Sequence, residues 1–304
     1  MAILFVLGAP RSGTTLLSGL LEQTQYGVPY ETQFIPKFFD KLVDYKDLSL
    51  RQNFTDIAND ILKQRSMQRF VKGFDINKAF DELSPNITYA SLVDYLCALQ
   101  RGETHLSWGD KTPWYLSRLD CMVGLFPTAK FIFIHRDGRD VALSLLQKKW
   151  GPNNIYSCAR YWKDLHDKQA ELRAKLEHNG QLISISYEAL LHEPVPIVNS
   201  LYRFLGENVE QSVVTSLCVN IRSDNANKWQ SKMSQSQIRV FDSVAGTTLK
   251  SFGYHAASHT KPISTFYKLC YSFHEYIKIA IYLFELNVID GLKIKFFGKQ
   301  PFHE

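Results

Sequence analysis

The chain opens on a continuous run of apolar residues, Ile3–Leu7, which predicts a strand that is buried on both faces. A loop bounded by two glycines, Gly8–Gly13, separates this strand from a stretch starting at Thr14 in which leucines recur at helical spacing. A strand, a tight loop and a helix N-terminus in this order direct several backbone N–H groups and the positive end of the helix dipole at one place. The pattern therefore predicts a phosphate-binding loop at the start of the chain.

A second unit of the same kind lies near the middle of the chain. It comprises a predicted strand over Phe131–Ile134, a turn at Asp137-Gly138 and a helix over Arg139–Lys149. Further patterns predict a strand at Leu182–Tyr187 and helices at Tyr161–Glu177, Pro194–Leu205 and Gln237–Tyr254. Alternating strands and helices favour an α/β fold with a central parallel sheet flanked by helices, in a P-loop-like three-layer sandwich.

Composition narrows the class of partner. The net charge of +5 suits an anionic nucleotide but is too small to argue for nucleic acid, so we expect no nucleic-acid partner. Five widely spaced cysteines without a CxxC pair argue against a zinc site or a disulfide framework and favour a reducing compartment. The chain shows neither a cleavable signal nor an apolar run of about 20 residues, so we expect a cytoplasmic protein.

The first loop has the spacing of a nucleotide phosphate loop but lacks its lysine. Thr14 follows the second glycine, where a nucleotide triphosphatase needs Lys to reach the β- and γ-phosphates. The positive charge lies inside the loop instead, at Arg11. These features predict a loop that holds a phosphate without hydrolysing ATP. An ordinary βα turn with a glycine at each end is the alternative interpretation.

The segment Gly8–Thr15, G-A-P-R-S-G-T-T, resembles the 5′-phosphosulfate loop of sulfotransferases that use 3′-phosphoadenosine 5′-phosphosulfate (PAPS). It is most similar to the branch that includes tyrosylprotein sulfotransferases and bacterial relatives, and the resemblance extends over about residues 3–254. It implies sulfuryl transfer from PAPS to a hydroxyl-bearing acceptor, with adenosine 3′,5′-bisphosphate as product and no metal. It also implies that the 5′-phosphosulfate contacts Arg11, Ser12, Gly13, Thr14 and Thr15.

The segment Glu31–Pro36, E-T-Q-F-I-P, matches an E-T-x-x-I-P element of that family. The resemblance implies that Glu31 is the catalytic base. A hydroxyl that attacks sulfur must lose its proton as the new bond forms, and a nearby carboxylate accepts it. A solvated loop glutamate or a helix-capping acid is the alternative.

A third matching element, K-T-P, begins at Lys111. We expect a short strand over His105–Trp108 and a loop from Gly109, which brings Lys111 to the carboxyl edge of the sheet, where ligands bind. The resemblance implies that Lys111 contacts the oxygen between phosphate and sulfate and, with Arg11, stabilises charge on the leaving phosphate. A surface lysine beside a turn is the alternative.

The second strand–turn–helix unit carries the counterparts of the family's 3′-phosphate site. The resemblance assigns this role to Arg136 at the strand end and to Ser144 about two helical turns into the helix, with Lys148 as a weaker contact. ATP has no 3′-phosphate, so this pair favours PAPS over ATP. The alternative for Arg136 is an ion pair with Asp137 or Asp140.

Later positions complete the implied nucleotide site. Tyr187 matches a family tyrosine that approaches the nucleotide, although a core tyrosine is an equal alternative. In relatives a segment with a Ser and a Lys closes over the nucleotide, which makes Ser223 and Lys228 the candidates, with Asn227 beside them. Such a closing segment would exclude water from the reaction.

Two other functions stay open at this stage: a P-loop kinase or nucleotide triphosphatase, and a non-catalytic nucleotide-binding module. We expect a sulfotransferase domain over residues 1–257 and a helical extension over 258–304, with apolar residues at helical spacing over 262–297. A helix docked on the core or on a second copy in a homodimer is favoured, and an amphipathic segment in peripheral contact with an anionic membrane is the sharper alternative. The acceptor, whether sugar, lipid, small molecule or peptide tyrosine, does not follow from the sequence.

Overall fold

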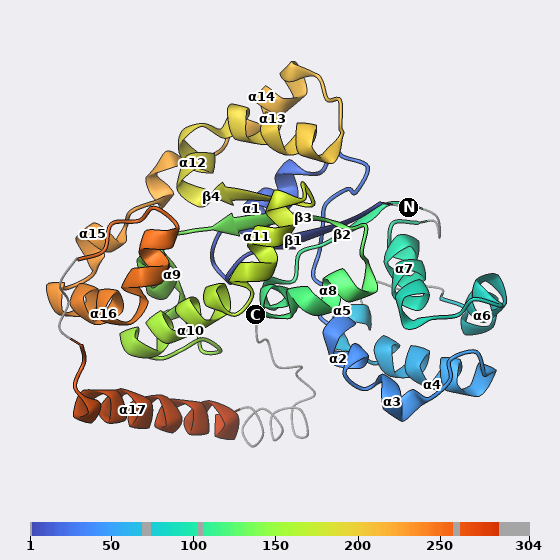
Figure 1. Ribbon diagram of the computed structural model, residues 1–304, viewed down its shortest axis with the longest axis horizontal. Coiled ribbons are helices and arrows are strands. Elements are labelled where there is room, and N and C mark those ends of the chain that lie inside the picture. The colour runs from blue at the N-terminus through green and yellow to red at the C-terminus, as the bar shows by residue number, and fades with distance from the viewer. Residues whose placement is uncertain (1, 69–73, 103–105, 258–261, 286–304) are drawn as a thin grey trace, which may run out of the picture. The chain divides into compact units, whose positions relative to one another are not determined.

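The computed structural model describes residues 2–68, 74–102, 106–257 and 262–285 (Figure 1). Its contacts divide the chain into two compact units. We call Met1–Arg136 with Lys168–Ala226 the sheet unit, and Asp137–Asp167 with Asn227–Glu304 the helical unit.

The sheet unit is built on four parallel strands in the order β2-β1-β3-β4. The strands are β1 (Ile3–Leu7), β2 (Trp108–Asp110), β3 (Lys130–His135) and β4 (Leu182–Ser186). Phe5 in the middle of β1 pairs with Asp110 of β2 on one side and with Phe131 of β3 on the other. The predicted α/β fold with a central parallel sheet is confirmed.

Helices fill the connections between the strands. In the sheet unit they are α1 (Thr14–Leu20), α2 (Ile35–Phe39), α3 (Leu42–Tyr45), α4 (Arg51–Leu62), α5 (Arg65–Gln68), α6 (Ile76–Leu83), α7 (Tyr89–Gln100), α8 (Leu119–Leu125), α11 (Ala170–His178), α12 (Tyr187–His192), α13 (Pro194–Leu205) and α14 (Gln211–Cys218), with the 3₁₀ helices η1 (Pro113–Arg118) and η2 (Ser223–Asn225). In the helical unit they are α9 (Gly138–Leu145), α10 (Ile155–Asp167), α15 (Trp229–Lys232), α16 (Gln235–Ser251) and α17 (Thr265–Phe284).

The two faces of the sheet carry different side chains, because alternate residues of a strand point in opposite directions. Aliphatic residues from three strands form one face and pack with α1, α12 and α13; they are Leu4, Val6, Ile132, Ile134 and Ile185. Aromatic residues dominate the other face, where the ring of Phe5 lies 5.7 Å from that of Trp108 and 5.6 Å from that of Phe131. Both faces are therefore covered, as the uninterrupted apolar runs predicted.

The helical unit is organised around the start of α9. Asp137 caps this helix and pairs with Arg139 at 2.7 Å, and both side chains are buried. A Cβ on Gly138 would lie 2.6 Å from the ring of Trp162 and 2.7 Å from that of Phe241, so this position requires glycine. The helices α9, α10 and α16 thus meet closely.

Several element boundaries differ from those expected. The second strand of the chain covers Trp108–Asp110 instead of His105–Trp108, and His105 itself lies outside the described residues. Gly109 lies inside that strand, where Pro29 packs against it, and an added Cβ would come within 2.8 Å of the proline ring. Glycine is therefore needed at this position because Pro29 lies against it, and not because the chain turns there.

The single helix expected over Tyr161–Glu177 is two helices, α10 and α11, with a break at 168–169. The charged pattern continues across this break, so periodicity alone does not reveal it. The helix expected over Arg139–Lys149 ends earlier, at Leu145. In the tail, α17 confirms helix over Thr265–Phe284, whereas 286–297 lie outside the described residues and the domain boundary at residue 257 stays a prediction. None of the helices in the described part of the chain is long and apolar enough to cross a membrane.

Candidate active site

The loop between β1 and α1 has the conformation of a tight anion-binding turn. The Ser12 N–H donates to the Ala9 carbonyl at 3.0 Å, and Arg11 and Gly13 have φ of 73° and 99°. The first helical bond of α1 runs from the Leu17 N–H to the Gly13 carbonyl. The N–H groups of the first turn have no partner within the helix, so they are available to an anion.

One further observation fits this loop to a phosphate or sulfate oxygen, and a second explains its glycine. The Ser12 hydroxyl is buried and has no hydrogen-bond partner among the described residues. Burying a hydroxyl without a hydrogen-bond partner destabilises the folded protein, and an anionic oxygen would supply that partner. Gly13 lies directly under Tyr187, where an added Cβ would come within 2.3 Å of the ring. The backbone is therefore packed closely and leaves no room for a side chain.

The predicted base and the predicted leaving-group cation lie together. The Lys111 ammonium donates to the Glu31 carboxylate at 2.7 Å and to the Thr15 hydroxyl at 3.4 Å. The Glu31 side chain is 36% exposed, whereas that of Lys111 is 11% exposed. Gln33 donates to the second carboxylate oxygen of Glu31 at 3.1 Å. Glu31 therefore keeps access to solvent while Lys111 lies deeper, next to the phosphate loop.

Asp110 holds the two segments that carry this pair, and the sequence analysis did not identify it. Its buried carboxylate accepts hydrogen bonds from the Thr32 N–H at 2.9 Å and from the Thr112 N–H at 2.7 Å. The Lys111 N–H donates to the Tyr30 carbonyl at 2.7 Å, which joins the same segments through the backbone. Burial raises the pKa of Asp110 to about 6 from its ordinary 3.8. Asp110 is thus a positioning residue between Glu31 and Lys111.

Tyr115 gives the Glu31 segment a second support. Its hydroxyl is linked to the Thr32 hydroxyl at 2.8 Å and accepts from the Ile35 N–H at 3.0 Å. Both Tyr115 and Thr32 are buried. The only signal for Asp110 in the sequence is a carboxylate at the end of a strand beside a candidate lysine, and no comparable signal marks Tyr115.

In the sheet unit, Arg136 at the end of β3 reaches the phosphate loop. Its guanidinium donates to the Arg11 carbonyl at 3.2 Å and to the Asn225 carbonyl at 2.6 Å, and it lies 4.4 Å from the ring centre of Tyr187. The Asn225 side chain donates to the Tyr187 hydroxyl at 2.7 Å. Tyr187 also belongs to the core cluster, and its approach to a nucleotide stays a prediction.

The remaining predicted contacts are divided between the units. Ser144 lies on α9 and Lys148 just after it, both half-buried, in the helical unit. Asn227 with φ of 57° and Lys228 at the start of α15 belong to the same unit. Ser223 is exposed and starts η2 in the sheet unit. The pairing of Arg136 with Ser144 at one phosphate stays a prediction.

Two buried acids hold elements of the helical unit together. Asp137 pairs with Arg139, and Asp140 accepts from the Trp229 N–H at 2.8 Å. The guanidinium of Arg139 also lies 3.5 Å from the ring centre of Trp229. These contacts hold α9 and α15 together within the helical unit.

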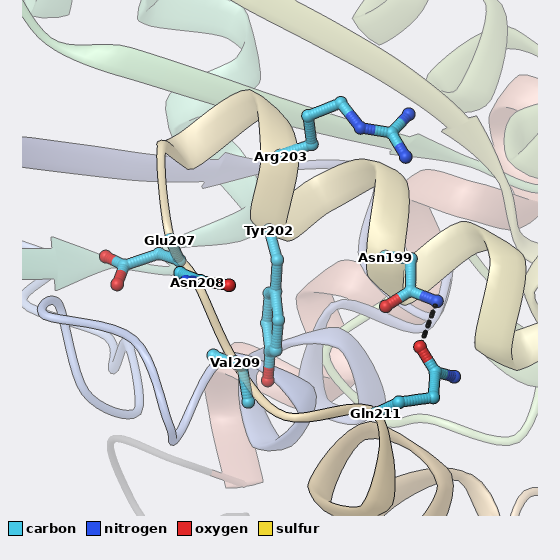
Figure 2. Close-up of a pocket in the computed structure, with 7 residues that line it drawn as sticks. All are labelled: Asn199, Tyr202, Arg203, Glu207, Asn208, Val209 and Gln211. Atoms are coloured by element: carbon cyan, nitrogen blue, oxygen red, sulfur yellow. Dashed lines mark hydrogen bonds between the residues drawn. The ribbon is translucent and has the colours of Figure 1, made fainter.

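A separate pocket of about 350 Å³ lies where α13 leads into α14 (Figure 2). Figure 2 shows the residues that line it, among them Tyr202 from α13, and the hydrogen bond between Asn199 and Gln211. None of the predicted site residues lines it. Among the described residues, no group of three or more His, Cys, Asp or Glu side chains is placed to hold a metal ion.

The fold of this chain is similar to that of two solved sulfotransferase domains. The sulfotransferase domain of the Synechococcus PCC 7002 olefin synthase superposes with a TM-score of 0.55 at 20% identity, over 84% of this chain and 96% of that one. The sulfotransferase domain from the curacin biosynthetic pathway gives a TM-score of 0.53 at 18% identity, over 84% and 99% of the two chains.

Among curated proteins, the chain is 25% identical over 211 residues to protein-tyrosine sulfotransferase 1 of Danio rerio. The matched region covers 67% of this chain and 53% of that protein. It is 24% identical over 211 residues to the protein-tyrosine sulfotransferase of Drosophila melanogaster, covering 67% and 38%. The chain therefore spans about half the length of these relatives or less. A model of the sulfotransferase family matches residues 4–211, from β1 to the start of α14. That match includes the phosphate loop, Glu31, Lys111, Arg136 and Tyr187, and on this basis the chain belongs to the sulfotransferase family.

Proposed function

We propose that this chain transfers a sulfuryl group from PAPS to a hydroxyl-bearing acceptor. The observation that carries the proposal is the contact of the Lys111 ammonium with both the Glu31 carboxylate and the Thr15 hydroxyl, in a chain of the sulfotransferase family. This contact joins a carboxylate that is open to solvent with a cation that borders the phosphate loop. A proton acceptor and a charge acceptor are the two groups that sulfuryl transfer requires.

In the proposed reaction the acceptor oxygen attacks sulfur in line with the bond from sulfur to the bridging phosphate oxygen. The bond from sulfur to the acceptor oxygen forms while the bond from sulfur to the bridging oxygen breaks. Adenosine 3′,5′-bisphosphate is the leaving group. Glu31 takes the hydroxyl proton, so no separate oxidant, reductant or metal enters the balance. General-base catalysis of this type contributes about 10²–10⁴-fold in rate.

The ion pair gives the two residues linked roles. As Glu31 accepts the proton it loses its negative charge, and the charge of Lys111 is then no longer balanced by its partner. The lysine can therefore stabilise the negative charge that develops on the leaving phosphate, together with Arg11 and the loop amides. Such an interaction strengthens in the transition state, so it accelerates the reaction more than it tightens binding.

We propose that the phosphate loop, Arg11–Thr15, holds the 5′-phosphosulfate. The buried Ser12 hydroxyl, which has no partner among the described residues, supports this assignment. Arg136 is proposed for the 3′-phosphate, since a planar guanidinium suits phosphate and its contact with the Arg11 carbonyl brings it to the loop. Ser144, Lys148, Tyr187, Ser223, Asn227 and Lys228 are proposed to complete the nucleotide site.

The nature of the acceptor is a separate proposal. The curated relatives are named protein-tyrosine sulfotransferases, so a tyrosine in a peptide is the first acceptor to test. Sugars, lipids and small hydroxyl compounds form the rest of the panel.

The test is transfer of label from ³⁵S-PAPS to a panel of tyrosine peptides, sugars, lipids and phenols. We expect label on at least one hydroxyl acceptor and its loss on replacement of Lys111 by Met. Release of phosphate from ATP with Mg²⁺ at a rate above that of any sulfuryl transfer would instead indicate a nucleotide triphosphatase. Tight binding of adenosine 3′,5′-bisphosphate without transfer to any class of acceptor would indicate a binding module.

A further inference from the structure

Within the helical unit, α17 packs on α10 and on the segment before it through the side that carries Tyr271 and Glu275. The Glu275 carboxylate accepts from the Asn153 N–H at 2.9 Å, from the Asn153 side chain at 3.1 Å and from the Asn154 side chain at 3.1 Å. These asparagines lie just before α10, beside which α17 runs as a straight helix of 20 residues (Figure 1). A carboxylate with three such donors fixes which side of α17 faces the protein.

Two more contacts lie on the same side. The ring of Tyr271 stacks on that of Tyr156 at 5.5 Å, and Glu285 pairs with Lys149 at 3.2 Å. With about 100° of rotation per residue, Tyr271, Glu275 and Tyr282 fall within an arc of about 40°. With Ser272 and Glu285, these are the half-buried residues of the helix and its C-cap, and together they span about 140° of the circumference.

The rest of the helix is exposed and carries its large apolar side chains. Phe266 and Phe273, for example, are 69% and 68% exposed. The exposed large apolar side chains of α17 are Phe266, Tyr267, Leu269, Phe273, Tyr276, Ile277, Ile279, Ile281, Leu283 and Phe284. On a helical projection they span about 240° of the circumference. This is the reverse of an ordinary surface helix, which turns its apolar side toward the protein.

Basic side chains border this apolar arc. Lys268 and Lys278 project on the helical wheel at its two edges, next to the docked side. At the N-terminal end of α17, Lys268 also lines a pocket of about 310 Å³ with Arg160 and Lys163 of α10. Pro262 and Ile263 add apolar surface to this pocket, and Asp164 is its one acidic residue. Cations beside exposed apolar surface are the combination that an anionic lipid headgroup and its acyl chain would meet.

We propose that α17 is a docking surface for a bilayer containing anionic phospholipid, with the helix lying along the membrane surface. The apolar arc enters the boundary between headgroups and acyl chains, where phenylalanine and tyrosine rings are favoured. Lys268, Lys278 and Arg160 meet lipid phosphates. A second copy of α17 would be a poorer occupant, because a two-helix seam covers a much narrower stripe than about 240°.

The test is flotation of the full chain with two kinds of vesicle. One contains phosphatidylcholine alone, and in the other about a third of the lipid is phosphatidylserine, which is anionic. We expect binding to both, stronger to the anionic vesicles. The double variant Phe273→Glu with Ile277→Glu should lower the partition coefficient at least about tenfold, since two apolar side chains are lost from the bilayer. Lys268→Glu should weaken binding to the anionic vesicles and leave binding to phosphatidylcholine unchanged.

Val219→Glu is the matched control, because Val219 is 73% exposed and lies on α14's C-terminal side in the sheet unit. Circular dichroism and the unfolding midpoint of each variant distinguish loss of docking from loss of folding. Equal flotation of the wild type and the double variant would overturn the proposal. So would a wild type that does not float but forms a dimer by light scattering, which Phe273→Glu with Ile277→Glu dissociates. Neither result depends on sulfuryl transfer.

Discussion

The Lys111 ammonium donates a hydrogen bond of 2.7 Å to the Glu31 carboxylate, across 80 positions of sequence. One residue follows β2 and the other lies in the segment between α1 and α2. Because Lys111 also contacts Thr15 at the start of α1, the pair is fixed to the phosphate loop. The proposed proton acceptor and the proposed cation for the leaving group therefore lie together in the sheet unit.

Replacing Glu31 with Gln should remove the base without removing the shape of its side chain. We expect kcat to fall by about 10²–10⁴-fold, while the affinity for adenosine 3′,5′-bisphosphate changes little. Labelled transfer and calorimetric titration measure the two effects. Glu22→Gln, at an exposed residue just after α1, is the control. Near-normal turnover of Glu31→Gln would show that another group takes the proton.

Asp110→Asn should disturb catalysis through the position of Glu31. An asparagine accepts through one oxygen only, so the N–H of Thr32 or that of Thr112 would face an amide NH₂. We expect kcat to fall at least about tenfold with a smaller change in product affinity. The exposed Asp120, changed to Asn, serves as control. A loss confined to binding of the bisphosphate would contradict this positioning role.

The same carboxyl predicts how stability depends on pH. Burial raises the pKa of Asp110 to about 6, so the folded protein holds this proton more tightly than the unfolded chain does. The stabilisation is fully present below the unfolded pKa of 3.8 and is lost as pH rises through about 6. Urea unfolding should show the free energy of the wild type, relative to Asp110→Asn, falling by roughly 3 kcal/mol across that window and then staying constant. A difference that does not vary with pH would refute this.

Arg136→Met should weaken binding of adenosine 3′,5′-bisphosphate more than binding of adenosine 5′-monophosphate, which has no 3′-phosphate. Charge-assisted hydrogen bonds of this kind contribute roughly 10–100-fold in affinity. Titration of both nucleotides into both proteins isolates the 3′-phosphate, and Arg203→Met provides a control at an exposed arginine of α13. An equal loss for the two nucleotides would assign Arg136 to the fold of the loop and not to the ligand.

Gly13→Ala should destabilise the protein and abolish nucleotide binding. Its φ of 99° is strained for alanine, and the new Cβ would lie 2.3 Å from the Tyr187 ring. Gly19→Ala in the same helix region meets open space and should stabilise by about 0.5–1 kcal/mol. Thermal unfolding of the pair compares these effects, and a Gly13→Ala protein as stable as the wild type would contradict the packing described.

The sequence predicted those parts of the fold that rest on local patterns. The strands β1 and β3 are covered on both faces and so appear as apolar runs, and the helix over Pro194–Leu205 has the bounds expected. The strand β2 was predicted at the wrong residues, because Gly109 suggests the start of a loop. This glycine instead leaves room for Pro29, which lies far away in the sequence. The break between α10 and α11 was missed because charged residues continue the helical pattern through it.

In the candidate site too, sequence motifs predicted some residues, whereas residues whose role depends on distant contacts were missed. Motif resemblance indicated Glu31, Lys111 and Arg136, which the structure brings to the phosphate loop within the sheet unit. Asp110 was missed because its role depends on the Thr32 N–H, 78 residues away. Periodicity revealed the apolar stripe of α17, but the side that docks depends on distant asparagines. The expected cytoplasmic location stays a prediction.

The most direct test of the proposed donor is a calorimetric titration of the full chain with adenosine 3′,5′-bisphosphate and, separately, with ATP and Mg²⁺. A site with one phosphate loop lacking its lysine and a second anion contact at Arg136 should bind the bisphosphate at least about tenfold more tightly than ATP. Equal or tighter binding of ATP with Mg²⁺ would contradict the account.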